Sequence, residues 1–566
     1  MPRLPALLPL VAFLLSLAAT PAEPAPGRAT HAMVAAANPL AAQAGLKVLK
    51  AGGSAVDAAV AVQAVLGLVE PQSSGVGGGA FMVYYDAATK RITAYDGRET
   101  APAGATPGMF LKPDGTPMSF SDAVLSGRSA GAPGAVALLS LAQREHGRRP
   151  WWSLFLEAER LAEHGFAVSP RLASETTWKV PETSAPDVIL YFSRPDGTRL
   201  KAGDILKNPA YAATLRRIAA DGPDGLLTGK VARDIVARLA APPLPGTMTL
   251  ADLAGYRPHE SPALCRPFRI WVVCTAQAPS GGPALLEGLG LLENTDIATR
   301  GPTDPQAWLQ LAEAERLMYA DRDAYEGDPA FFPFPLQGLL DPGYLKTRAA
   351  LIGNRLASAP PAPGHPAGLA EARADATHEP GGTSHFVVVD AQGDVVSMTT
   401  TVESAFGDGR MVDGFFLNNQ LTDFSFGPKD ATGAPAANAV APGKRPRSSM
   451  APVIVLDQKG RFVLALGSPG GSSILSYNLK ALIAALDWRL PLDQAFALPN
   501  LVARGPSITS EPDRYAPGVV AALAAKGVAF KPGSGGEESG LHGVIRTPTG
   551  LTGAADDRRE GVALGY

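Results

Sequence analysis

The sequence predicts an α+β protein whose sheets are covered by helices, and three observations support this fold class. The chain has 566 residues, which is too many for one hydrophobic core and enough for two to four packed layers. Apolar residues in 133–325 mostly follow helical spacing, whereas strand patterns dominate from residue 383 onwards. Strands followed by helices along the chain are typical of a sheet with helices packed on it.

Composition and charge are those of an ordinary globular protein. Hydrophobic residues make up 46% of the chain, charged residues make up 18%, and the formal net charge is −3. Because both signs of charge are mixed, no polyanion-binding surface is predicted and nucleic acid is not an expected partner. The 61 glycines and 52 prolines concentrate in loops, which indicates many tight turns rather than general disorder.

Residues 1–22 are predicted to be a secretory signal peptide. Arg3 supplies a positive start, residues 7–17 form a short apolar run, and Thr20-Pro21-Ala22 offers small residues at a cleavage site. The apolar run is too short to span a membrane as a helix, and no other stretch approaches that length. We therefore expect a periplasmic or secreted protein without a membrane span.

Two helices and a hairpin are predicted next. A helix over 39–50 stops at Gly52-Gly53, and Ser54 with Asp57 resembles a capping box for a helix over 55–69.

A tight, glycine-rich loop over 71–79 follows, and then a hairpin of 80–86 and 91–96 with Arg98 just beyond it. The loop lacks the preceding strand and the acidic partner of a dinucleotide site, so we do not interpret it as one.

The only cysteines, Cys265 and Cys274, flank a predicted hairpin over 266–273 with a sharp turn at Pro267. In an oxidising compartment they could pair across that hairpin or remain reduced. Because no histidine lies nearby in the sequence, a zinc site is not expected.

A helix and a linker precede the strand-rich region. Residues 306–325 form an amphipathic pattern whose charges are most simply a solvated face. Residues 357–382 are rich in Pro and Gly, so they are expected to pack poorly. Such a segment is a reasonable place for a chain to be cut.

Thr383 stands where this linker stops and an apolar strand begins. It could simply start the strand. If the backbone were cut before it, however, its new α-amine, with a reference pKa of roughly 7.7–8.0, could take the proton of its own hydroxyl. His385 invites assignment as a base, but the amine already fills that role, so we favour a packed or orienting histidine.

Strands over 385–390 and 395–401 flank the turn 391–394. Simple antiparallel register pairs Thr383 with Val402, whereas a bulge of one residue would bring Thr401 beside Thr383. In both registers Thr401 and Glu403 lie near Thr383. Further strands are predicted over 415–419, 453–457 and 462–467, and a helix over 475–485.

Three polar stretches follow Thr383 and carry candidate site residues. They are 417–424, 444–450 and 467–472. The backbone N–H groups of Gly470 and Gly471 could bind an oxyanion. Taken singly, Arg98 could be a surface ion pair, Asp423 could cap a turn, and Ser448 and Ser449 could be ordinary loop hydroxyls.

Together these motifs resemble the gamma-glutamyltransferase (glutathione hydrolase) family of N-terminal-nucleophile hydrolases, from about His31 to the C-terminal region. The stretches that carry the resemblance are 52–59, 70–79, 96–102, 278–282, 312–329, 383–390, 418–424, 445–450 and 467–471. The resemblance implies a four-layer αββα sandwich built from two chains, a large subunit of 23–382 and a small, catalytic subunit of 383–566. No cofactor and no metal are expected.

The resemblance also implies roles for individual residues. Thr383 matches the residue that cleaves its own chain and then acts as nucleophile, Thr401 the residue that hydrogen-bonds it, and Gly470 with Gly471 the oxyanion hole. The residues that match the substrate-binding set are Arg98, Ser448 and Ser449 for the α-carboxylate, and Gln420 and Asp423 for the ammonium. Position 403 is Glu here, whereas some members have Asn; an extra carboxylate favours an ammonium and disfavours acyl groups that lack one.

The implied activity is hydrolysis and transpeptidation of γ-glutamyl amides such as glutathione, with amino acids or peptides as acceptors. The stretch from Asp423 to Ser448 is shorter than in members with a full lid, which predicts that hydrolysis outruns transfer. One alternative keeps the fold with another acyl group, a glutaryl-type β-lactam side chain or poly-γ-glutamate. Another is an unprocessed, non-catalytic binding protein.

Overall fold

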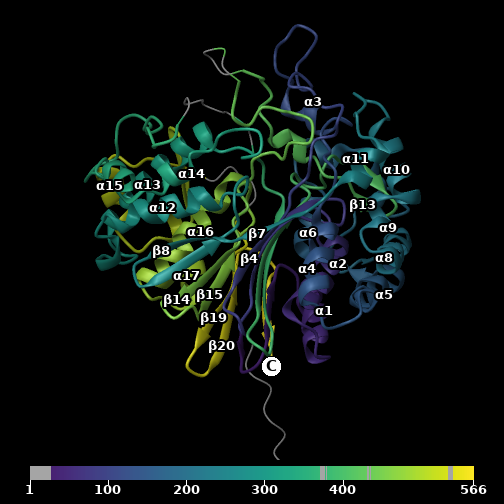
Figure 1. Cartoon of the computed structure of the whole chain (residues 1–566), viewed down its shortest axis with the longest axis horizontal. Helices are drawn as coiled ribbons and strands as arrows, with labels where there is room; N and C mark the ends of the chain where they lie inside the picture. Colours follow the sequence, from purple (N-terminus) through teal and green to yellow (C-terminus); the bar gives the residue numbers. More distant parts are fainter. Residues whose placement is uncertain (1–26, 370–376, 378, 430–432, 434, 533–538) are drawn as a thin grey trace, which may run out of the picture.

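The computed structural model describes residues 27–369, 377, 379–429, 433, 435–532 and 539–566. The predicted signal peptide, residues 1–22, lies outside them. Two seven-stranded sheets stack at the centre, and helices cover the outer face of each (Figure 1). The α+β, four-layer αββα architecture expected from the sequence is therefore confirmed.

The first sheet, which we call the β10 sheet, contains Thr383. Its strands in spatial order are β21 (Val562–Gly565), β2 (Met33–Ala36), β10 (Thr383–Val389), β11 (Val395–Thr401), β3 (Gly79–Tyr85), β4 (Ile92–Gly97) and β7 (His259–Pro262). All neighbouring strands are antiparallel. Every residue of β10, β11 and β3 is buried, because the sheet is covered on both faces.

The second sheet, the β15 sheet, is antiparallel as well. Its strands are β1 (Arg28–Ala29), β20 (Gly550–Ala555), β19 (His542–Thr547), β15 (Phe462–Gly467), β14 (Val453–Asp457), β9 (Trp271–Thr275) and β8 (Leu264–Phe268). Val387 and Val389 of the β10 sheet pack against Ile454 and Ala465 of this one, in an apolar core between the sheets.

Separate apolar cores join each sheet to its helices. The helices outside the β10 sheet include α1 (Pro39–Lys50), α2 (Ala55–Val69), α4 (Ala135–His146), α5 (Leu156–His164) and α8 (Pro209–Asp221). Those outside the β15 sheet include α12 (Gly282–Glu293), α13 (Pro305–Tyr325), α15 (Pro342–Ala349), α16 (Ile474–Leu482) and α17 (Leu492–Ala497). The two groups lie on opposite sides of Figure 1.

The predicted helices 39–50 and 55–69 are confirmed as α1 and α2. Ser54 Oγ accepts from the backbone N–H of Asp57 at 3.1 Å, and the Asp57 carboxylate accepts from that of Ser54 at 2.9 Å. This reciprocal capping box satisfies two N–H groups that the start of a helix leaves unpaired. The predicted hairpin at 80–96 is confirmed as β3 and β4.

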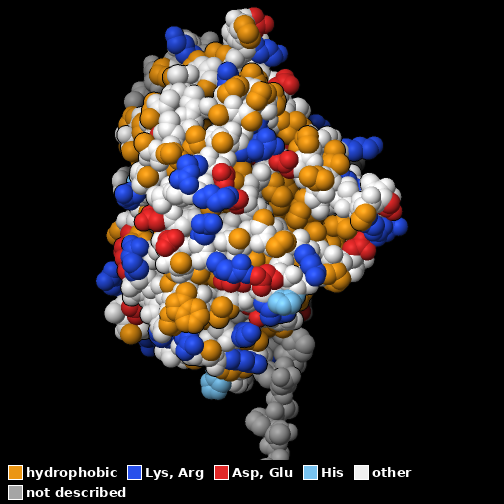
Figure 2. Space-filling model, turned by 90° about the vertical axis from the view of Figure 1, so that its right-hand side faces the viewer, with side chains coloured by type: hydrophobic (Ala, Val, Ile, Leu, Met, Phe, Trp, Pro, Cys, Tyr) orange, Lys and Arg blue, Asp and Glu red, His pale blue; other side chains and the backbone are white. Residues whose placement is uncertain are grey.

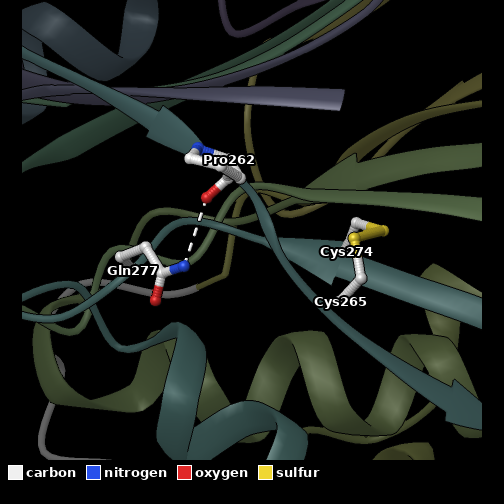
Figure 3. Close-up of a disulfide and its surroundings, with 4 residues drawn as sticks. All are labelled: Pro262, Cys265, Cys274 and Gln277. Atoms are coloured by element: carbon white, nitrogen blue, oxygen red, sulfur yellow. Dashed lines mark hydrogen bonds between the residues drawn. A yellow bond between two sulfur atoms is a disulfide. The ribbon is translucent and has the colours of Figure 1, made fainter. Parts of the chain in front are cut away.

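The Cys265–Cys274 disulfide is present and joins directly opposed residues of β8 and β9 (Figure 3). The predicted turn at Pro267 is wrong, because Pro267 lies within β8 and pairs with Val272. The chain reverses instead at Arg269, whose φ is 54°. A proline is tolerated in β8 because this strand is at the edge of its sheet.

The expectation that helix 306–325 presents its charges to solvent is wrong. Glu313, Glu315, Arg316, Asp321 and Arg322 on α13 are all buried. The helix packs against α12, α18 (Val519–Ala525) and β16 (Leu501–Arg504), so it is covered on several sides. Its charges therefore form buried ion pairs, among them Arg316–Glu313 at 2.9 Å.

The β10–β11 register differs from the simple pairing of Thr383 with Val402. Thr383 lies opposite Thr401, and the ladder down to Val389–Val395 is regular. The predicted four-residue turn is tighter, because the backbone N–H of Asp390 donates to Asp394 O at 3.0 Å. Gly393, with φ of 87°, supplies the left-handed residue of this turn. Thr401 thus reaches Thr383 without a bulge.

On the face of the molecule shown in Figure 2, basic and acidic side chains are interspersed and do not form a patch of one sign. Among the described residues, no helix combines the length and the apolar character needed to cross a bilayer.

Candidate active site

Thr383 begins β10 at the centre of its sheet, and its side chain is buried. Its hydroxyl donates to Thr401 Oγ1 at 3.2 Å. The Thr401 hydroxyl in turn donates to Gly382 O at 2.5 Å and accepts from the backbone N–H of Glu403 at 2.8 Å. The proton and both lone pairs of the Thr401 hydroxyl are thereby used. Thr401 thus connects the Thr383 hydroxyl to the carbonyl of the preceding peptide bond.

Local backbone geometry brings these groups together. A Cβ at Gly382 would lie 2.1 Å from Glu403 O, so only glycine permits this close approach. Glu403 has a φ of 83°, a conformation that is uncommon for residues other than glycine. Such strain persists only where the surroundings impose it and is frequent at functional sites.

Gly470 and Gly471 lie between β15 and α16, with φ values of 130° and 53°. The chain before Thr383 runs across this loop. The backbone N–H of Ser472 donates to Glu379 O at 3.4 Å, and a Cβ at Gly471 would lie 2.3 Å from Pro380 O. The glycines thus leave room for a backbone that passes directly over them.

Arg98 follows β4 and is buried, which rules out a surface ion pair. Its Nη2 donates to Asp423 Oδ2 at 2.5 Å and to Arg447 O at 2.7 Å, and its Nε donates to Pro446 O at 3.1 Å. Asp423 is the last residue of a short helix, Gln420–Asp423, and does not begin one. The expected carboxylate-binding and ammonium-binding residues therefore form an ion pair with each other.

Gln420 joins this pair to Glu403. Its Nε2 donates to Glu403 Oε2 at 2.5 Å and to Asp423 Oδ2 at 3.0 Å. Among the described residues, Arg98 Nη1, Asp423 Oδ1 and Gln420 Oε1 are buried without a hydrogen-bond partner. One donor and two acceptors are thus available, which suits a ligand with a carboxylate and an ammonium.

Three carboxylates surround the guanidinium of Arg98, namely those of Glu99, Glu403 and Asp423. Burial raises the pKa of Glu99 to about 8. Burial and the neighbouring Asp423 raise the pKa of Glu403 well above its usual value. The cluster is therefore short of positive charge, and a bound ammonium would favour the ionised form of Glu403.

Ser448 and Ser449 have different surroundings. Ser448 Oγ accepts from the backbone N–H of Met450 at 3.1 Å, within its own turn. Ser449 Oγ donates to Glu379 Oε2 at 2.5 Å and accepts from Arg322 Nη2 at 2.8 Å. The Ser449 hydroxyl is thus bound to a carboxylate, although that carboxylate belongs to the same chain.

His385 is on β10 and lies between the two sheets, with its ring against Gly467 of β15. Its Nδ1 lies 2.9 Å from Thr399 Oγ1, and a Cβ at Gly467 would lie 2.4 Å from the imidazole ring. Complete burial lowers the pKa of His385 well below its usual value, so the ring is neutral. These contacts agree with the packed histidine that we favoured.

Sequence reasoning missed Glu379 and its arginine partners, Arg322 and Arg447. Arg322 Nη1 and Nη2 donate to the two Glu379 carboxylate oxygens at 2.9 Å each, and Arg447 Nη2 donates to Oε1 at 3.2 Å. The helical pattern predicts a solvated face for Arg322, and the composition of the linker predicts poor packing for Glu379. The available signal was the position of Glu379, an acid in a Pro- and Gly-rich stretch shortly before Thr383.

The fold and this threonine at the start of a central strand define the class of N-terminal-nucleophile hydrolases. A family model described as gamma-glutamyltranspeptidase matches residues 41–566. The chain therefore belongs to the gamma-glutamyltranspeptidase family, as its motifs predicted.

Individual relatives agree with this assignment. The glutathione hydrolase proenzyme of Bacillus subtilis strain 168 is 37% identical over 548 residues, which cover 94% of this chain and 91% of that protein. The acylase ACY 1 proenzyme of Pseudomonas sp. strain SE83 is 33% identical and covers 96% of this chain and 95% of its own length. The crystal structure of a cephalosporin acylase from Bacillus halodurans superposes with a TM-score of 0.81 at 24% identity, over 98% of this chain and 99% of that one, which shows the shared fold.

Proposed function

We propose that this protein is a γ-glutamyl hydrolase and transpeptidase that acts on glutathione and other γ-glutamyl amides after cutting its own chain before Thr383. The observation that carries the proposal is the hydrogen-bonded series Thr383–Thr401–Gly382, together with the nearby Arg98–Asp423 pair. Residues 1–22 are the signal peptide that directs the chain to the periplasm or outside the cell. Residues 23–382 and 383–566 form the large and small subunits.

Cleavage begins when Thr383 Oγ1 attacks the carbonyl carbon of Gly382. A C–O bond forms, the C–N bond breaks, and the hydroxyl proton moves to the nitrogen, which becomes the free α-amine of Thr383. Water then hydrolyses the ester, giving the carboxylate of Gly382 and restoring the Thr383 hydroxyl. Thr401 supports the first step because it donates to Gly382 O, where negative charge develops.

Turnover uses the same hydroxyl on the substrate. The new α-amine of Thr383 accepts the hydroxyl proton while Oγ1 attacks the γ-carbonyl carbon, and the backbone N–H groups of Gly470 and Gly471 bind the oxyanion. The C–N bond breaks, the leaving amine takes the proton, and a γ-glutamyl ester remains on Thr383. Water or the amine of an amino acid or peptide then attacks this ester and frees the enzyme.

Selection of the γ-glutamyl group depends on charge. Arg98, with Ser448 and Ser449, binds the α-carboxylate, and Asp423, Gln420 and Glu403 bind the ammonium. Asp423 Oδ1 and Gln420 Oε1, buried without partners among the described residues, support this assignment. Without an ammonium, Glu403 keeps its proton and Asp423 stays paired with Arg98, so an acyl group that lacks an ammonium gains no attraction from these carboxyl groups.

Two measurements test the proposal. Sequencing the N-terminus of the smaller band after denaturing electrophoresis should give Thr-Ser-His-Phe, which begins at residue 383. The purified protein should release p-nitroaniline from γ-glutamyl-p-nitroanilide, and Thr383→Ala should abolish both cleavage and release. One uncut band of about 58 kDa with full activity would refute the proposal, and one without activity would favour an unprocessed binding protein.

The acylase relative supports a second candidate, the same fold acting on another acyl group. The groups that the sequence left open are a glutaryl-type β-lactam side chain and poly-γ-glutamate. Comparing γ-glutamyl- with glutaryl-p-nitroanilide distinguishes the first possibility, since only the γ-glutamyl group carries an ammonium for Asp423. Faster release from the glutaryl substrate would favour the acylase.

The short stretch between Asp423 and Ser448 bears on the fate of the γ-glutamyl ester. An incomplete lid leaves the ester open to water, so hydrolysis should exceed transfer. The ratio of the two products, measured with a dipeptide acceptor at alkaline pH, tests this expectation. Dominant transfer at low acceptor concentration would contradict it.

A further inference from the structure

The carboxylate of Glu379, four residues before Thr383, accepts four hydrogen bonds from buried side chains. Both nitrogens of the Arg322 fork donate to it, and Arg447 Nη2 and Ser449 Oγ add one hydrogen bond each. The side chains of Arg322 and Arg447 have no exposed surface, and that of Glu379 is 3% exposed. A bidentate arginine with two further donors is a built carboxylate site.

The electrostatics agree with this geometry. Burial by itself would raise the pKa of Glu379, but Arg322, Arg447 and Arg504 together hold it well below its usual value. The carboxylate is therefore charged throughout the physiological pH range. This site adjoins the proposed substrate cluster, because Arg98 Nη2 donates to the backbone O of Arg447 at 2.7 Å. The charge of Glu379 accordingly raises the pKa of both Glu403 and Asp423.

The rest of the segment contrasts with Glu379. Residues 357–369, 377 and 379–382 contain neither helix nor strand. From Glu379 the backbone crosses the Gly470–Gly471 loop and reaches Gly382, whose carbonyl accepts from Thr401. The stretch Glu379–Gly382 is thus held by the carboxylate at one end and by the carbonyl before Thr383 at the other.

We propose that Arg322, Arg447 and Ser449 form a carboxylate site that Glu379 fills before cleavage, and that a substrate carboxylate uses after cleavage. While Glu379 is bound, it positions the Gly382–Thr383 bond against Thr401 and keeps ligands out. Once the bond is cut, the new chain end can withdraw and release Ser449 and the two arginines. This inference rests on the proposed function and adds a positioning residue and two ligand-binding arginines to it.

Glu379 and a substrate carboxylate cannot occupy this site together, because both would need the same hydrogen-bond donors. Ser449 Oγ has one proton, which it donates to Glu379 Oε2 at 2.5 Å. Both Nη atoms of Arg322 also donate to Glu379. A second carboxylate cannot use these donors at the same time, so departure of Glu379 and entry of substrate are coupled.

The first test follows the rate at which newly made precursor is cut, using electrophoresis of samples taken after synthesis. Glu379→Gln should slow cleavage at least about tenfold, because the charge-assisted bonds to both arginines are lost. Glu379→Asp should be cut faster than Glu379→Gln, since it retains the charge. Glu313→Gln is the matched control, because Glu313 is a buried acid on α13 that pairs with Arg316 and binds Ala357 N, at the far end of the segment. It should be cut at the wild-type rate.

The second test measures ligand binding without cleavage. In the uncut Thr383→Ala protein, calorimetry should show L-glutamate binding at least about tenfold more weakly than in the Thr383→Ala/Glu379→Ala double variant, where the site is vacant. Adding Arg322→Ala to the double variant should remove the gain. Thermal unfolding of each variant establishes that it is folded, and Glu379→Ser, whose short side chain also leaves the arginines unoccupied, replaces Glu379→Ala if that variant unfolds.

Wild-type cleavage in Glu379→Gln, or equal L-glutamate affinity with and without the Glu379 side chain, would overturn this inference while leaving the γ-glutamyl activity intact. Conversely, a wild-type protein that is cut before Thr383 but does not turn over γ-glutamyl-p-nitroanilide would refute the proposed function. The cleavage assay needs no substrate, so the two failures are distinguishable.

Discussion

At the scale of single residues, the site combines one hydroxyl network with one charge cluster. Thr401 uses its only proton on Gly382 O and its lone pairs on Thr383 and Glu403. Arg98 and Asp423 neutralise each other until a ligand arrives. The hydroxyl network is complete without a ligand, whereas the charge cluster, among the described residues, leaves Arg98 Nη1, Asp423 Oδ1 and Gln420 Oε1 without hydrogen-bond partners.

Thr401→Ala should slow cleavage before Thr383 by about 10²-fold or more, because it removes the donor to the carbonyl where charge develops. Thr401→Ser, which keeps the hydroxyl, should remain within about tenfold of wild type. Thr400→Ala is the control, since Thr400 is also buried in β11 but donates to Gly79 O. Electrophoresis over time measures all three, and rapid cleavage of Thr401→Ala would contradict the role of this hydroxyl.

Asp423→Asn should lower kcat/KM for γ-glutamyl-p-nitroanilide by about 10²-fold, because the ammonium of the substrate loses its carboxylate partner. Losing one partner of a buried charge pair costs about 2–5 kcal/mol. The loss of the Arg98–Asp423 ion pair affects every acyl group equally. Activity on glutaryl-p-nitroanilide, which has no ammonium, therefore serves as an internal control and should fall much less. An equal loss on both substrates would mean that Asp423 only orients Arg98.

At the scale of elements, local patterns predicted helices α1 and α2 and the β3–β4 hairpin well, because caps, glycines and periodicity are local signals. The register of β10 was not predictable, since it depends on how Asp390 closes its turn onto Asp394. The burial of the charged residues of α13 was not predictable for a different reason. A helical pattern does not show how many neighbouring elements will cover the helix. Arg322 and Glu379 are far apart in the sequence and come into contact only in the folded chain.

Glu315, a buried carboxyl group on α13, provides a test of how burial of these charged residues affects stability. Ala503 N donates to its carboxylate at 2.8 Å, and burial raises its pKa to about 8. Between pH 4.5 and 8 the folded chain keeps a proton that the unfolded chain has lost, so this group's contribution to stability falls as pH rises. Glu315→Gln cannot titrate, so its stability relative to wild type should increase from pH 5 to pH 8 by an amount on the order of 3 kcal/mol.

Thermal unfolding of both proteins at the two pH values measures this change. The unfolding temperature of the variant minus that of wild type should rise by several degrees between pH 5 and pH 8. The pH 5 comparison controls for any packing defect that the amide introduces. A difference that does not vary with pH would show that Glu315 is ionised in the folded protein at neutral pH.

At the scale of the whole molecule, the two proposed subunits are interleaved. In the β10 sheet, β10 and β11 from the region after Thr383 lie between β2 and β3 from the region before it. In the β15 sheet, β14 pairs with β9, and β20 pairs with β1, again across the proposed cut. A break before Thr383 therefore severs one peptide bond and leaves the strand ladders of both sheets intact.

This arrangement predicts that the cut protein behaves as one cooperative body. Separating the subunits would expose both apolar faces of the sheets, so the pair should elute together in size-exclusion chromatography even at nanomolar concentration. Native mass spectrometry should give a single heterodimer, and urea should release both chains in one transition. Thr383→Ala, which stays uncut, is the matched control, and its transition should be similarly steep because the same surface is buried. Separation of the chains by dilution alone, without denaturant, would show that the ladders across the cut contribute little to holding the fold together.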